Sequence, residues 1–181
     1  MRAYYFDDLP GDQRLPHDSG KSVDAATLSA IGVLHWHIPV DDESGKHIEG
    51  IDAVARERDC KNRDVIVVTK ESLGDEYETK IKNFYKEHMH EDEEIRYILE
   101  GGGYFDVREH ASEAWIRCHM RAGDLLVLPA GIYHRFTLDE GNKSRTMRLF
   151  KDEPKWIAHN RGPETDVNPY RIDYVKSVAV A

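Results

Sequence analysis

The chain has 181 residues, the length of one ordinary domain and enough for a sizeable core. Its formal net charge of −9 argues against a surface for nucleic acid or for an anionic membrane. The two cysteines, Cys60 and Cys118, form no spaced framework, so we expect a reduced, intracellular protein. The sequence has no secretory signal and no apolar run of about 20 residues, so we expect neither export nor membrane insertion.

Helical patterns are concentrated in the first half of the chain. Residues 1–21 are rich in Asp, Gly and Pro, which predicts an extended segment with turns. The sequence then predicts three helices, with Ser22 as the first N-cap and a capping box of Asp75 and Glu78 at the third. The expected helices are 22–31, 47–58 and one from about residue 75 to 85. Strands are expected at 34–38 and, as a short buried strand, at 64–69.

After residue 86 the pattern becomes that of a β-protein. Short runs of strand-forming residues are separated by turn signals at 101–103, 121–124 and 140–142. We expect strands at 96–99, 103–108, 115–120, 125–128, 135–138 and 146–150. Many short strands at regular spacing predict a sandwich or barrel, and the turn-rich residues from 151 onward are expected to pack over it. We therefore predict a mainly β (α+β) single domain over 1–181, with an N-terminal part at 1–86, a barrel core at 87–150 and a C-terminal extension at 151–181.

The stretch from His88 to His134 carries the strongest chemical signal. His88 and His90 share one face of a strand, because side chains alternate along it. Asp92 and Glu94 have the same parity, so parity alone does not choose between them. His134 ends the pattern G-x5-P-x-G-x2-H and would arrive from a later strand. Three imidazoles and a carboxylate suit Fe(II), Ni(II), Mn(II) or Zn(II), and a six-coordinate ion would keep positions for a substrate.

Arg96 follows in the same parity, so we expect its side chain to point into the barrel. An inward arginine needs an anionic partner, and an anionic substrate would supply one. The expected apolar wall of a substrate pocket consists of Phe84, Phe105, Val107, Leu128 and Phe136.

Other polar residues receive structural interpretations. His35 and His37 with Asp41 imitate the metal motif, but Pro39 interrupts their strand and no second half-site follows, so we expect no metal there. Glu100 could act as a general base, although a surface carboxylate at a strand end is favoured. We expect Cys118 in the core rather than on a metal.

The spacings H-x-H-x3-E and G-x5-P-x-G-x2-H resemble the two motifs of the cupin superfamily. The longer segments HMHEDEEIRYILEGGGYFDVR, LPAGIYHRFTLDE and MRLFKDEPKWIAHNR, with PGDQRLPH near the start, resemble acireductone dioxygenases of the eukaryotic type. The resemblance covers most of the chain. It is highly specific in the centre and looser over residues 38–70 and at the C-terminal end.

The resemblance implies a cupin jelly-roll barrel, or double-stranded β-helix, and an enzyme of methionine salvage. Such enzymes use Fe(II) and O2 to split 1,2-dihydroxy-3-keto-5-methylthiopentene into formate and 4-methylthio-2-oxobutanoate. With Ni(II) they give methylthiopropanoate, formate and carbon monoxide. The resemblance assigns His88, His90, Glu94 and His134 as ligands of one Fe(II) or Ni(II) ion per chain, choosing Glu94 over Asp92. It assigns Arg96 to orienting the substrate.

Two further function classes stay open at this point. Another cupin role would be a metal-dependent isomerase or epimerase, or a barrel that binds a small molecule without catalysis, because fold does not fix function. Oxygen consumption on an enediol substrate would distinguish a dioxygenase from these alternatives. We expect a monomer in the cytoplasm, with the nucleus also open to a protein of this size.

Overall fold

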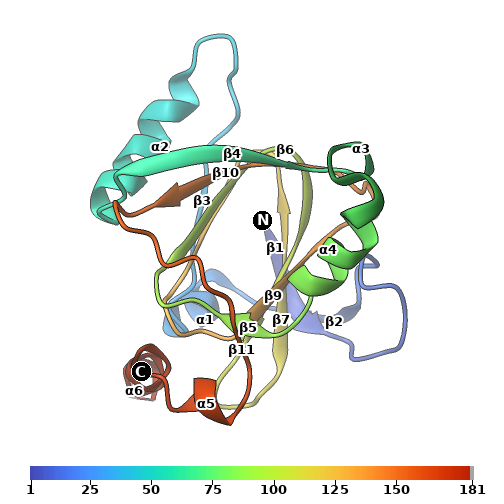
Figure 1. The fold of residues 1–181 in the computed structure, drawn as a ribbon, viewed down its shortest axis with the longest axis vertical. Helices are drawn as coiled ribbons and strands as arrows, with labels where there is room; N and C mark the ends of the chain where they lie inside the picture. Colours follow the sequence, from blue (N-terminus) through green and yellow to red (C-terminus); the bar gives the residue numbers. More distant parts are fainter. Residues whose placement is uncertain (180–181) are drawn as a thin grey trace.

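The structure is a computed structural model and describes residues 1–179. Its antiparallel strands form two sheets that share one long strand, β6 (Glu94–Arg108). The first sheet has the order β11 (His159–Asn160), β5 (His88–Met89), β9 (His134–Leu138), β6, β7 (Trp115–Arg121), β1 (Arg2–Phe6), β2 (Asp18–Ser22). The second has the order β4 (Asn62–Val68), β10 (Ser144–Phe150), β6, β8 (Asp124–Leu128), β3 (Leu34–His37). The strands curve into a barrel (Figure 1), which confirms the predicted mainly β fold.

Strand β6 joins the sheets where the sequence predicts a turn. The turn expected at 101–103 is wrong, because the strand continues through it. Before this point β6 pairs with β8 and β10, and after it with β7 and β9. Gly101 has φ +72°, and a Cβ there would lie 2.0 Å from the carbonyl oxygen of Lys143. Glycine therefore lets β6 bend from one sheet into the other without ending.

The structure adds detail to one prediction for the first half and corrects another. Residues 1–21, predicted as an extended segment with turns, contain β1 and most of β2, joined by a turn-rich loop at 7–17. Strand β1 also pairs with β7. The polar sequence DSGKS of β2 shows no apolar alternation, because β2 is an exposed edge strand. Strand β4 is not fully buried: Val65 is 46% and Val67 44% exposed. It lies at the edge of the second sheet, where its outer face meets solvent.

The helices of the first half match the prediction in number of segments but not in their caps. Helix α1 (Ala25–Ala30) is capped by Asp24, because Ser22 ends β2. Helix α2 (Lys46–Glu57) lies one residue from its predicted range. The third segment is α3 (Lys70–Leu73), a 3-10 turn (Gly74–Glu76) and α4 (Tyr77–Phe84). Its capping box is formed by Thr69 and Ser72, so the box predicted at Asp75 and Glu78 is wrong.

Two helices in the C-terminal extension were not expected from the sequence. They are α5 (Pro163–Asp166) and α6 (Pro169–Val178), and both begin with proline in the first turn, where its missing N–H is no loss. Figure 1 shows them together at the end of the barrel near β5 and β11. The buried apolar residues of α2 belong instead to a core cluster with residues of β6, β8 and β10. No helix within residues 1–179 is long and apolar enough to cross a membrane.

Cys118 lies in the barrel core, as predicted. Its side chain is fully buried, and burial raises the pKa of the thiol to about 12. Cys60 is half-buried. A three-unit rise reduces the thiolate fraction about 1000-fold, so we expect a thiol reagent at pH 8 to modify Cys60 first. Mass spectrometry after timed labelling checks this order, and equal labelling of both residues in the native protein would contradict it.

A buried ion pair ties the N-terminal loop to β7 and β9. Arg117 donates from Nε to Asp106 at 2.7 Å, both side chains are fully buried, and Arg135 donates to the same carboxylate at 2.8 Å. Arg117 also donates to the carbonyl oxygens of Gln13 and Leu15. This network therefore fixes the strand that carries His134.

Replacing Arg117 by methionine should lower the free energy of unfolding by about 3–5 kcal/mol, because it leaves a buried carboxylate underpaired. Urea unfolding checks this value, with Arg56→Met on the exposed side of α2 as the control. A loss for Arg117→Met no larger than for the control would show that the pair contributes nothing net.

Candidate active site

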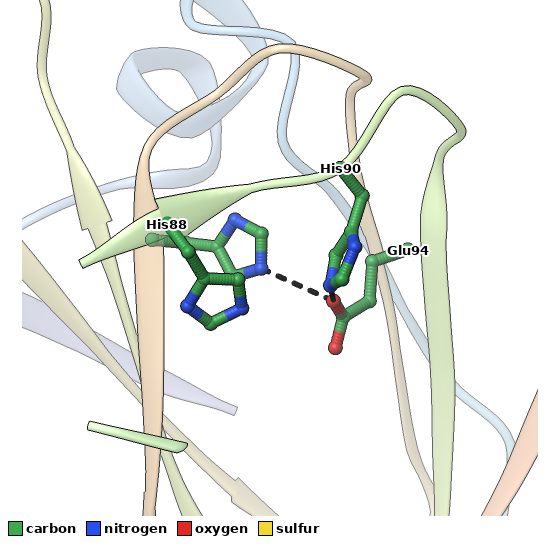
Figure 2. A group of neighbouring side chains, drawn as sticks. His88, His90 and Glu94 are labelled. Atoms are coloured by element: carbon green, nitrogen blue, oxygen red, sulfur yellow. Dashed lines mark hydrogen bonds and ion pairs between the residues drawn. The ribbon is translucent and has the colours of Figure 1, made fainter. Parts of the chain in front are cut away.

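Three strands bring together four residues that the sequence predicts as metal ligands. His88 on β5 lies directly opposite His134 on β9, His90 follows β5 by one residue, and Glu94 begins β6. One potential ligand atom from each lies within 4.8 Å of those from the other three. Figure 2 shows the rings of His88 and His90 turned toward the Glu94 carboxylate. Residues that are 46 positions apart in sequence thus form one cluster.

Each histidine is held by a backbone carbonyl. The Nδ1 atoms lie 2.7, 2.9 and 3.0 Å from the carbonyl oxygens of Lys86, Ile157 and Ile132, for His88, His90 and His134 respectively. A carbonyl oxygen can only accept, so Nδ1 carries the proton and Nε2 keeps its lone pair. This is the arrangement found around metal-binding histidines, where the second nitrogen fixes the tautomer.

The Nε2 atoms of two of these histidines face one oxygen of Glu94. Oε2 lies 3.2 Å from Nε2 of His90 and 3.1 Å from Nε2 of His134. Lone pairs facing a carboxylate oxygen repel unless a proton or a cation lies between them. The donor set and its geometry therefore fit a divalent cation.

The charge states of His88 and Glu94 agree with this fit. Burial and the neighbouring His134 lower the pKa of His88 to about 4, so its imidazole is neutral at pH 7. Burial alone would raise the pKa of Glu94, but Arg96 and two imidazoles hold it well below the usual range. One anionic carboxylate and a neutral imidazole are the forms that bind a metal.

Asp92, the alternative of equal parity, points elsewhere. Its carboxylate accepts the backbone N–H of Lys155 at 2.8 Å, outside the cluster. The acidic turn at 91–93 breaks the strand alternation that made the two carboxylates equivalent. The structure thus places Glu94, and not Asp92, beside the histidines.

Arg96 lies next to the cluster with its side chain 14% exposed. Its Nη2 is 3.2 Å from Oε1 of Glu94, the oxygen that does not face the histidines, and its Nη1 donates to the carbonyl of Ile95. The two oxygens of Glu94 thus serve different neighbours. The guanidinium is inside the barrel, as the parity argument predicts.

A cavity of about 580 Å³ opens onto the cluster and Arg96. Phe84, Phe105 and Phe136 line it, in agreement with three of the expected wall residues. Val107 and Leu128 do not line it, because both are buried in the core between the sheets, where Val107 pairs with His134. The cavity is large enough for a small linear substrate.

Sequence reasoning missed the wall that β4 and β10 supply. Its residues are Ile66, Val68, Ser144, Thr146 and Arg148, and Trp156 completes it from the segment that follows β10. The β10 residues 144, 146 and 148 alternate with outward residues, so strand parity could have indicated them. Trp156 lies in a stretch without periodic signal.

Within residues 1–179, the residues of the imitation motif do not form a cluster of potential metal ligands. His35 and His37 instead contact Oδ1 of Asp124 at 2.9 and 3.1 Å, and Asp41 accepts from Ser44. Glu100 is exposed and pairs with Lys143, as the surface reading predicts.

Comparison with known proteins identifies the family. A sequence model of the ARD/ARD' family matches residues 2–158. The chain belongs to this family. It is 58% identical over 180 residues to "Acireductone dioxygenase 1" of Coprinopsis cinerea, covering 99% of both chains. It is 57% identical over 176 residues to an acireductone dioxygenase of Phaeosphaeria nodorum, covering 97% of this chain and 96% of that one.

A solved structure of the ARD/ARD' family supports the architecture. The acireductone dioxygenase of Bacillus anthracis, described with a cadmium ion in its active center, superposes with a TM-score of 0.61. The two chains are 26% identical, and the match covers 74% of this chain and 86% of that one. The cupin barrel expected from the sequence is therefore the fold of this family member.

Proposed function

We propose that this chain is an acireductone dioxygenase of methionine salvage. The observation that carries the proposal is the convergence of three imidazoles and one carboxylate in the lining of a cavity, with Arg96 beside them. Membership of the ARD/ARD' family fits the same reaction. The substrate would be 1,2-dihydroxy-3-keto-5-methylthiopentene, and the co-substrate O2.

His88, His90, Glu94 and His134 would hold one Fe(II) or Ni(II) ion per chain. A divalent ion there would supply Lewis acidity toward the oxygens of the bound enediolate. The carbonyl-bonded Nδ1 atoms would keep the three imidazoles in the tautomer and orientation that binding needs. Iron would lead to formate and the keto acid, and nickel to methylthiopropanoate, formate and carbon monoxide.

Arg96 would orient the substrate. Its guanidinium is buried, carries fixed donors and faces the cavity, so it can bind the anionic oxygens of an enediolate. The aromatic wall of Phe84, Phe105 and Phe136 would hold the methylthio end and exclude water. The two ends of the substrate thus meet two different sides of the cavity.

The isomerase alternative finds little support in the cavity. An isomerase needs a placed acid–base pair. Within the part of the lining that residues 1–179 provide, Glu94 is the one carboxylate, and it belongs to the cluster. We further propose a monomer in the cytoplasm, with the nucleus also open.

Oxygen dependence tests the proposed reaction class. We expect the metal-loaded protein to consume O2 when acireductone is generated in its presence, and to leave the acireductone unchanged under nitrogen. An oxygen electrode and chromatography of the substrate give the two readings. Conversion under nitrogen would indicate an isomerase, and binding without conversion in either gas would indicate a non-catalytic barrel.

A further inference from the structure

Three charged residues lie side by side on neighbouring strands, two of them in the cavity wall. Arg148 on β10 is directly opposite Arg96 on β6, and on its other side it is directly opposite Asp64 on β4. Both arginines line the cavity. Like charges directly opposite one another in a sheet are destabilising, so this row of Asp64, Arg148 and Arg96 needs an explanation.

The row separates its charges into two pairs. Arg148 donates from Nε to Oδ1 of Asp64 at 2.8 Å and from Nη2 to the other carboxylate oxygen, which is a bidentate pair. Arg96 instead contacts Glu94, on the side of the metal cluster. The ring of Trp156 packs on the guanidinium of Arg148 from another side, with its centroid 4.5 Å from Cζ. Each arginine therefore has its own carboxylate.

We propose that Arg148 is a positioning residue that acts through Arg96. By holding the Asp64 carboxylate in a bidentate pair, Arg148 keeps that carboxylate from drawing the Arg96 guanidinium away from the cluster. Arg96 then stays available to the anionic end of the substrate. This inference rests on the proposed function, since it assigns Arg96 an anionic substrate.

The physical consequence is specific. Without Arg148, Asp64 is left without its partner two strands from Arg96, with β10 between them. An unpaired carboxylate at that place attracts the Arg96 guanidinium. Arg96 should then divide its donors between Asp64 and the substrate. Substrate binding should weaken, whereas the metal ion should stay bound, because the histidines face the Glu94 oxygen that Arg96 does not contact.

The test uses four variants of the full chain: Arg148→Met, Asp64→Asn, the double variant, and Arg145→Met. Arg145 is the matched control, because it lies on β10 with the opposite parity and faces away from the cavity. Metal content is measured for each protein. We also measure KM and kcat for acireductone. Finally, we measure the Kd of ascorbate, a stable enediolate, with the Ni(II)-loaded protein under nitrogen.

We expect Arg148→Met to raise both KM and the ascorbate Kd about tenfold, the size of one charge-assisted hydrogen bond. Metal content and kcat should change little. The double variant should return KM and Kd to within about threefold of the wild type, since the competing carboxylate is also gone. Asp64→Asn and Arg145→Met should resemble the wild type.

Other results overturn the inference. A double variant as impaired as Arg148→Met would show that Arg148 contacts the substrate itself. Lost metal, or a fall in kcat at unchanged KM, would show a structural role. A wild-type protein that consumes no O2 would defeat the proposed function instead, and the ascorbate affinities would still decide the role of Arg148.

Discussion

Replacing His88 by alanine is expected to abolish oxygen consumption and to remove the bound metal ion. Loss of a group that merely orients a metal ligand weakens metal binding by about 10–100-fold, so loss of the ligand itself should weaken it further. Metal analysis after gel filtration, together with an oxygen electrode, measures both effects. We expect the wild type to hold about one ion per chain, because four ligands hold a single ion. In His88→Ala the metal content should fall toward zero.

His37→Ala is the matched control for this experiment. His37 stands in the same H-x-H spacing, but its side chain is 57% exposed and contacts Asp124. We expect this variant to keep its metal and its activity. Equal metal loss in both variants would mean that the ion is not held by the cluster around Glu94.

Arg96→Met should lower kcat/KM by about 100- to 1000-fold, the range found when one fixed donor to a developing charge is removed. The physical reason is that the enediolate loses the buried cation beside the metal cluster. Methionine matches the length of the arginine stem, so packing changes little. Metal content and the free energy of unfolding are measured alongside the kinetics.

The metal content of Arg96→Met distinguishes a role in orienting the substrate from a role in holding the metal ion. Arg96 contacts Oε1 of Glu94, whereas the histidines face Oε2. We therefore expect Arg96→Met to keep its metal ion. Wild-type kinetics in this variant would remove Arg96 from the mechanism, and loss of the ion would reassign it to holding Glu94.

The chemistry of the site was largely readable from the sequence, because spacing fixes which side chains share a face. His88 and His90 stand two apart on a strand, and His134 follows a turn pattern that fixes its place. Local parity could not separate Asp92 from Glu94, since an acidic turn interrupts the strand between them. Only the resemblance, and then the fold, placed Glu94 beside the imidazoles.

What escaped prediction depends on long-range contacts. Gly101 signals a turn locally, but its positive φ serves a bend within β6. The position of Val107 follows from its pairing with His134, which no local pattern reports. The row of Asp64, Arg148 and Arg96 exists only because β4, β10 and β6 are neighbours in this register. Sheet partners are set by the whole fold, not by the segment.

The most direct test of the proposed function is product analysis on the metal-free protein reloaded separately with Fe(II) and Ni(II). Acireductone is generated in place under O2. We predict formate and 4-methylthio-2-oxobutanoate with iron, and methylthiopropanoate, formate and carbon monoxide with nickel. No oxygen uptake with either metal, despite one-to-one binding that His88→Ala removes, would contradict the dioxygenase assignment.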